Sequence, residues 1–191
     1  MPDAGLLVWV AALLSLERLT YAAVWRAPNA FRRWSDRHAP AHSAIDTLAL
    51  LFVGFKVLQA GVFAAWCLIQ SGGSLKPHSS DPLVLTAGAL LIAAGQALNL
   101  SVFRALGKVG VFYGNRLGHH VPWQHRFPFT WFDHPQYLGT VLTIWGFFFA
   151  MRFPAPDWLF VPVLETIFYA VGTWFERDSI PTDERYARAK E

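Results

Sequence analysis

Apolar residues gather into five long stretches along the chain, and short polar segments separate them. The stretches run over Ala4–Trp25, Ser43–Gln70, Pro82–Leu106, Gln136–Phe153 and Asp157–Phe175. A helix needs about 20 mostly apolar residues to cross the ~30 Å hydrocarbon core of a bilayer. The pattern therefore predicts five hydrophobic helices. The fourth stretch is the shortest, so we expect that helix to be tilted, broken or partly buried in protein.

Composition places these helices in a membrane. Of the 191 residues, 54% are hydrophobic and only 15% are charged, and the mean hydropathy is +0.31. A chain of this size cannot bury so much apolar surface in one water-soluble core. We therefore predict an all-α integral membrane bundle with four or five spanning helices, and we treat residues 1–191 as one membrane domain.

Basic residues in the connectors predict how the bundle is oriented. They cluster after the first and third helices, at Arg26, Arg32, Arg33, Arg37, Arg104, Lys108, Arg116 and Arg126. The positive-inside rule places both segments in the cytoplasm, with the C-terminus. If the first helix is re-entrant or interfacial, only the N-terminus changes side. Anionic headgroups account for the net charge of +3, so we expect no nucleic-acid partner; the oligomeric state stays open.

Several ionisable residues fall within the predicted spans, where a charge is costly unless it is paired or used. Glu17 and Arg18 lie late in the first helix, Lys56 lies in the second and Glu165 in the fifth. We expect Lys56 to pair with Glu17 or Glu165, and we keep Glu165 as a catalytic candidate. Asp46 lies in a first helical turn, where a carboxylate suits the helix dipole.

A polar, proline-broken stretch, Phe127–Gly139, leads straight into the fourth helix. It brings Asp133, His134 and Tyr137 to the mouth of an apolar segment, where polar groups cost free energy unless something uses them. His134 and Pro135 also suit the first turn of a helix. Capping and ligand contact are compatible, and we predict both.

Glycines punctuate the end of the third helix and the connector that follows it, at Gly95, Gly107, Gly110, Gly114 and Gly118. Such glycines let a backbone approach another helix or a ligand. Because they continue into a polar segment with Tyr113 and Arg116, we predict a ligand cradle. The nearby histidines match no zinc spacing, so we expect no metal.

Three stretches, in this order, resemble the phosphatidylethanolamine N-methyltransferase family, within the wider group that includes isoprenylcysteine carboxyl methyltransferases. They are Ala105–Gly118, Phe127–Gly139 and Trp174-Phe175-Glu176. The resemblance implies a membrane enzyme that uses S-adenosylmethionine to methylate lipid-embedded nucleophiles. The cofactor contacts expected with it are Gly95, Gly107, Gly110, Tyr113, Gly114, His134, Pro135, Tyr137, Gly139, Glu176 and Arg177.

The chain departs from the family pattern at two places. The family has Gly-x-Gly in the third helix where this chain reads Ala93-Ala94-Gly95, and two glutamates where it reads Glu176-Arg177. The resemblance implies that both places contact the cofactor. Asp178 is close enough in sequence to replace the second carboxylate.

Methyl transfer to an amine needs alignment of donor and acceptor, exclusion of water and a proton acceptor. Candidate proton acceptors are His119, His120, His125, Asp133 and Glu165. Arg116 and Arg126 suit a lipid phosphate, although positive-inside anchoring explains them equally well. Trp131 lies beside the polar stretch and is a candidate for cation recognition.

These observations lead to one hypothesis and two alternatives. We predict a multi-pass membrane enzyme, in a bacterial inner membrane or an endoplasmic reticulum-type membrane, that methylates phosphatidylethanolamine or its partly methylated forms. The lipid enters sideways between helices, and S-adenosylmethionine comes from the cytoplasm. The alternatives are another membrane-borne acceptor, such as a prenylcysteine carboxylate or a thiol, and a non-catalytic protein of the same fold.

Overall fold

The computed structural model describes residues 3–152 and 156–177, and all regular elements in this part of the chain are helical. The elements are α1 (Ala4–Arg26), α2 (Pro28–His38), α3 (Ala44–Gln70), α4 (Pro82–Val111), α5 (Pro135–Ala150), η1 (Pro156–Leu159) and α6 (Phe160–Arg177). Four segments are long and apolar enough to cross a membrane: α1, α3, α4 and Asp157–Glu176. The predicted all-α, membrane-type bundle is confirmed.

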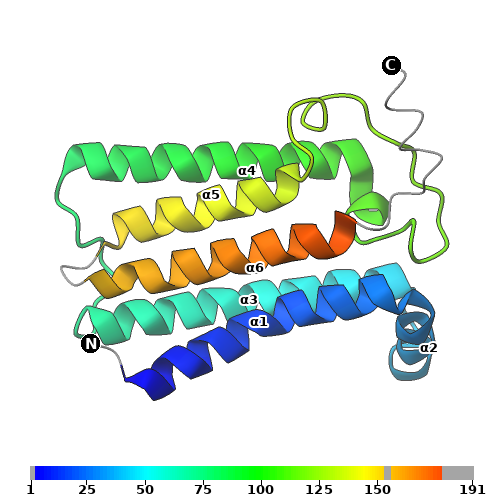
Figure 1. The fold of residues 1–191 in the computed structure, drawn as a ribbon, viewed down its shortest axis with the longest axis horizontal. Coiled ribbons are helices and arrows are strands. Elements are labelled where there is room, and N and C mark those ends of the chain that lie inside the picture. The colour runs from blue at the N-terminus through cyan, green and yellow to red at the C-terminus, as the bar shows by residue number, and fades with distance from the viewer. Residues whose placement is uncertain (1–2, 153–155, 178–191) are drawn as a thin grey trace.

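The five long helices lie side by side, and consecutive ones run in opposite directions (Figure 1). Each packs against its neighbours in the order α3, α1, α6, α5, α4, whereas α3 and α4 make few contacts with each other. The connectors at 27–43 and 112–134 therefore lie at the same end of the bundle as the end of α6 (Figure 1). We call this the connector end.

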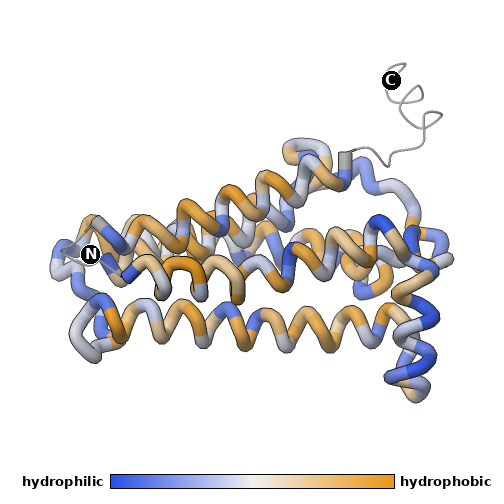
Figure 2. The backbone as a smooth tube through the Cα atoms, turned by 60° about the horizontal axis from the view of Figure 1, so that its bottom comes forward, coloured by the Kyte–Doolittle hydropathy of each residue, from blue (hydrophilic) through white to orange (hydrophobic). Residues whose placement is uncertain are grey.

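Helix α2 was not predicted, because it is short and amphipathic rather than apolar. Its residues are mostly hydrophilic, and it crosses the connector end of the bundle (Figure 2). Ser35 is fully buried, and its hydroxyl is 2.7 Å from the Thr47 hydroxyl of α3. This buried contact fixes α2 against the start of α3.

Glycines let α4 and α5 pack backbone against backbone. A Cβ at Gly88 would lie 2.8 Å from the Gly146 carbonyl oxygen, and a Cβ at Gly139 would lie 2.7 Å from the Gly95 carbonyl oxygen. Both distances are shorter than van der Waals contact, so only glycine fits. Close approach through small residues is a common way for membrane helices to associate.

A polar network joins α1, α3 and α6 in the middle of the bundle. The Glu17 carboxylate accepts hydrogen bonds from Arg18 at 2.6 Å and from Lys56 at 3.0 Å. The Gln59 carbonyl accepts from Lys56 at 3.2 Å, and its amide donates to Glu165 at 2.7 Å. Lys56 thus pairs with Glu17, one of its two predicted partners, and reaches Glu165 through Gln59.

Candidate functional site

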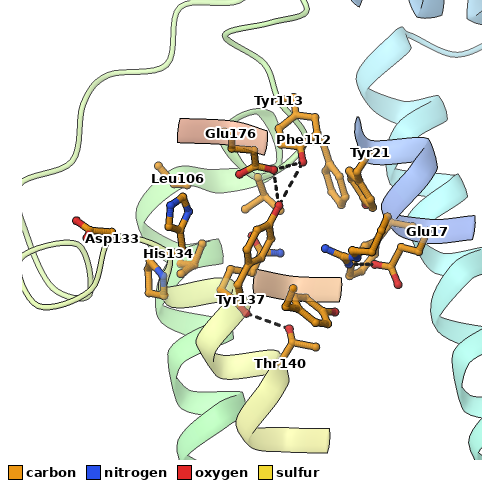
Figure 3. Close-up of a pocket in the computed structure, with 18 of the residues that line it drawn as sticks. Glu17, Tyr21, Leu106, Phe112, Tyr113, Asp133, His134, Tyr137, Thr140 and Glu176 are labelled. Atoms are coloured by element: carbon orange, nitrogen blue, oxygen red, sulfur yellow. Dashed lines mark hydrogen bonds and ion pairs between the residues drawn. The ribbon is translucent and has the colours of Figure 1, made fainter. Parts of the chain in front are cut away.

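A polar cavity of about 180 Å³ lies near the connector end, between α1, α3, α4, α5 and α6. Residues from all five helices and from the 112–134 connector line it (Figure 3). Its charged lining residues are Glu17, Arg18, Lys56, Asp133 and Glu176. Because the chain segments that line it are far apart in sequence, the cavity exists only in the folded bundle.

Glu176 is the central acceptor of a hydrogen-bond network in the cavity (Figure 3). Its carboxylate accepts hydrogen bonds from the hydroxyls of Tyr113, at 2.6 Å, and Tyr137. Tyr113 follows the end of α4 with φ of +55°, a left-handed conformation that is uncommon for a residue with a side chain. Burial is the largest cause that raises the pKa of Tyr113 well above its usual value, so its hydroxyl remains a donor. Residues from two other segments, the connector and α5, thus converge on a single carboxylate of α6.

Four of the chain's five tyrosines line this cavity, and a guanidinium lies among them. The Arg18 Cζ atom is 4.1 Å from the centre of the Tyr169 ring and 5.5 Å from those of Tyr21 and Tyr137. Tyr21 also meets Tyr113 edge to face, with ring centres 5.5 Å apart. The faces of such rings attract cations, so they stabilise the Arg18 guanidinium in the wall of the cavity.

His134 and Asp133 close the cavity from the connector side (Figure 3). His134 is the N-cap of α5, and its backbone carbonyl accepts from the amides of Tyr137 and Leu138, at 3.1 Å each. Its side chain makes no capping hydrogen bond and stacks on Tyr137, with ring centres 5.8 Å apart. Capping therefore uses the backbone, and the imidazole contributes to the cavity wall.

The structure brings seven of the predicted site residues together in this cavity: Gly110, Tyr113, Asp133, His134, Pro135, Tyr137 and Glu176. Four of the predicted glycines lie elsewhere. Gly95 and Gly139 meet each other between α4 and α5. Gly107 has a φ of 62° at a kink in α4. The amide of Gly114 donates to the Val109 carbonyl at 2.8 Å. Neither Gly107 nor Gly114 lines the cavity.

The remaining predicted residues also lie outside the cavity lining. His119, His120, His125, Arg126 and Trp131 are exposed on the connector. Arg116 stacks on Trp25, with its Cζ 4.2 Å from the ring centre. Glu165 is buried and bonds to Gln59. Arg177 is the last residue of α6, and its side chain, like Asp178, falls outside the described part of the chain.

The lining residues that had not been assigned to the site from the sequence include Glu17, Arg18, Tyr21, Lys56 and Tyr169. The sequence did mark three of them as charges inside spans, which is the signal that points to a functional network. No local motif connects them with the 127–139 stretch. Among the described residues, no group of three or more His, Cys, Asp or Glu side chains is placed to hold a metal ion.

Comparisons with known proteins agree with the three sequence stretches. The profile of the phospholipid methyltransferase family matches residues 83–187, more than half of the chain. Phosphatidylethanolamine N-methyltransferase of Rattus norvegicus is 29% identical over 155 residues, covering 78% of this chain and 76% of that protein. The Homo sapiens protein of the same name is 28% identical over the same length.

A plant relative matches a shorter part of the chain more strongly. Phosphatidyl-N-methylethanolamine N-methyltransferase of Arabidopsis thaliana is 43% identical over 54 residues, 28% of this chain and 33% of that protein. No solved structure matches significantly. Together, the family match and the apolar helices identify a multi-pass membrane protein. The chain belongs to the phospholipid methyltransferase family.

Proposed function

We propose that this protein transfers a methyl group from S-adenosylmethionine to the amine headgroup of phosphatidylethanolamine or of its partly methylated forms. The observation that carries the proposal is the convergence of Tyr113, Tyr137 and Glu176 beside a cation held between tyrosine rings. The names of the relatives given above state that those proteins act on these lipids. The polar cavity is then the place where donor and acceptor meet.

The lining residues fit the chemistry of the donor. S-adenosylmethionine carries a sulfonium and an ammonium, and the cavity offers aromatic faces and a carboxylate for two positive groups. The Arg18 guanidinium, 4.1 Å from the Tyr169 ring centre, occupies the place of such a cation. Glu176 would hold the ammonium, and the ring of Tyr137, whose hydroxyl donates to this carboxylate, would face the sulfonium. When bound, the donor supplies a methyl group activated by the positive sulfur.

The protein's remaining tasks are to orient the acceptor and to remove its proton. An ammonium headgroup must lose one proton before its nitrogen has a lone pair for attack. Asp133 is the predicted proton acceptor that lines the cavity. Its exposed side chain can take the proton from the acceptor nitrogen and release it to water. The buried tyrosines exclude water from the other side of the cavity.

The connector end would face the cytoplasm. The arginines at 26, 32, 33 and 37 and the basic residues at 104, 108, 116 and 126 belong to segments at this one end of the bundle. The positive-inside rule favours the cytoplasmic side for such a cluster. The cavity would therefore open towards the compartment where S-adenosylmethionine is made.

Labelled S-adenosylmethionine tests the proposal directly. The detergent-purified protein is incubated with it and a mixed lipid extract, and the labelled lipid classes are separated. We expect label in mono-, di- and trimethylated ethanolamine lipids. Label only in a prenylcysteine ester or a small thiol would overturn the proposed acceptor, and calorimetry without saturable heat from S-adenosylmethionine would overturn the enzyme assignment.

Two variants test the position of the donor. Glu176→Gln keeps the shape but removes the charge, and a hydrogen bond to a charged group contributes roughly 1.5–3 kcal/mol, so donor binding should weaken about 10- to 100-fold. His134→Ala should weaken donor binding less, because this substitution removes only one wall of the cavity. Trp131→Ala, exposed on the connector, is the matched control. Unchanged affinity in both site variants would show that the donor binds elsewhere.

A further inference from the structure

A second and larger cavity lies between α3 on one side and α4 with α5 on the other. This groove encloses about 740 Å³, a size typical of sites that bind whole small molecules. It runs along the place where α3 and α4 make few contacts. Because these two helices have the length of membrane spans, the groove opens sideways towards the bilayer.

The polarity of the groove changes along its length. Phe63, Phe147 and Met151 line its end far from the connectors. The middle carries polar side chains, Gln59, Gln96, Asn99 and Thr143, and the end near the connectors carries both polar Gln136 and Thr140 and apolar Phe52 and Phe103. Gln136 and Phe147 are eleven residues apart on α5, which corresponds to roughly 16 Å of helix. Half of a ~30 Å hydrocarbon core is about 15 Å. The groove between these two residues therefore has the length of an acyl chain in one leaflet.

The groove adjoins the polar cavity. Phe52, Lys56, Gln136 and Thr140 line both. An amphiphile with its chain in the groove would therefore place its headgroup at the entrance to the polar cavity. The amine of an ethanolamine lipid lies beyond the phosphate, so it would extend towards Glu176 and Asp133.

Lys56 stands at this junction. Among the described residues along the groove wall, it alone carries a charge. Its ammonium has one charged partner, Glu17 at 3.0 Å, and two neutral ones, the Gln59 carbonyl at 3.2 Å and the Tyr169 hydroxyl at 3.3 Å. A phosphate oxygen makes a stronger, charge-assisted bond than either neutral acceptor. The ammonium can exchange one neutral partner for the phosphate and keep its pair with Glu17.

We propose that the groove between α3 and α4–α5 binds an acyl chain of the acceptor, and that Lys56 binds the acceptor's phosphodiester. Lys56 is then a specificity residue that selects amines linked to a phosphate over amines of similar chain length without one. Arg116 and Arg126, the phosphate partners expected from the sequence, line neither cavity. This inference rests on the proposed function, because it describes how the acceptor of that reaction is held.

Two acceptors separate phosphate recognition from chain binding. One is phosphatidylethanolamine, and the other is an aminoethyl ether glycerolipid with the same chains and no phosphate. For Lys56→Met we expect KM for the phospholipid to rise about 10- to 100-fold, which is the range for a lost hydrogen bond to a charged group. KM for the ether lipid should change little. Lys56→Arg keeps the cation, so it should restore most of the preference for the phospholipid over the ether lipid.

Blocking the groove provides a second test that does not touch the polar network. Ala60 lines the groove with an exposed side chain, so a larger residue can extend into the groove without entering the core. Ala60→Trp should lower turnover of long-chain phosphatidylethanolamine at least about 10-fold but spare a short-chain, water-soluble analogue. Ala97→Trp is the control, because Ala97 is also exposed and lines neither cavity.

The outcomes distinguish this inference from the proposed function. If the unmodified protein labels no ethanolamine lipid, the proposed function fails and the inference fails with it. If it labels the lipid, but Lys56→Met raises KM equally for both acceptors, Lys56 has only a structural role. If Ala60→Trp behaves like Ala97→Trp towards long-chain lipid, the acyl chain does not occupy the groove. Either of the last two results overturns the inference while the proposed function stands.

Discussion

Gly95 offers a sharp test of the geometry of α4 and α5, because two roles are possible for it. The family pattern implies contact with the donor, whereas the structure places it against the backbone of α5. A Cβ at Gly95 would collide with the Gly139 carbonyl and with the Thr143 side chain. That side chain is itself held, because its hydroxyl donates to the Gly139 carbonyl at 2.9 Å. The neighbours therefore have little freedom to move.

The expected effect of Gly95→Ala follows from two opposing contributions. Alanine in a helix is favoured over glycine by up to about 1 kcal/mol, whereas overpacking of a tight contact costs about 1–3 kcal/mol. We expect a net destabilisation of about 1–2 kcal/mol. At Gly61, nothing lies within 4 Å of a Cβ, so Gly61→Ala should stabilise by up to about 1 kcal/mol. The same substitution thus has opposite signs at two positions.

The assay is equilibrium unfolding in detergent micelles, followed by tryptophan fluorescence, together with calorimetry of S-adenosylmethionine binding to the folded protein. Gly95→Ala should unfold more easily than Gly61→Ala and still bind the donor with nearly unchanged affinity. A Gly95→Ala protein as stable as the unmodified one, but with donor binding lost, would refute the reasoning. It would place Gly95 against the donor and not against α5.

Three further predictions follow from the site. Asp133→Asn should lower kcat by about 10²–10⁴-fold if the carboxylate takes the acceptor's proton. His119→Ala, on the exposed connector, should leave kcat unchanged. Single-turnover kinetics compares the two variants. Glu17→Gln leaves Arg18 and Lys56 without the buried carboxylate that they share and should destabilise by about 3–5 kcal/mol in the same unfolding assay. Trp131→Ala, 76% exposed, should change neither stability nor phospholipid turnover; a large loss of turnover would restore its predicted contact with the substrate.

The long helices were predictable because each is an apolar run of spanning length, a signal carried within one segment of sequence. The end of α4 was not. The predicted helix ends at Leu106, whereas α4 continues to Val111 through a kink at Gly107. Glycine adopts the required backbone conformation without steric cost, so it bends the helix where the sequence pattern suggested a stop. Tyr113, whose hydroxyl donates to Glu176, comes two residues after the end of this bent helix.

The site was predictable only where its residues are close together in sequence or belong to a family motif. Asp133, His134 and Tyr137 are within five residues of each other, and their position before an apolar run marks them. Arg18 and Tyr169 lie on separate helices and meet only because α1 packs against α6. Contacts of that kind depend on the relative rotation of the helices, which no local pattern specifies.

The structure gives a physical reason for the residues found at the two departures from the family pattern. Position 93, alanine in this chain, is exposed, whereas the retained Gly95 is buried against α5. The glycine that tight packing requires is therefore the one that the sequence keeps. At the other departure, Glu176 keeps the carboxylate to which the two tyrosine hydroxyls donate. The charge reversal therefore leaves in place the carboxylate around which the proposed donor site is built.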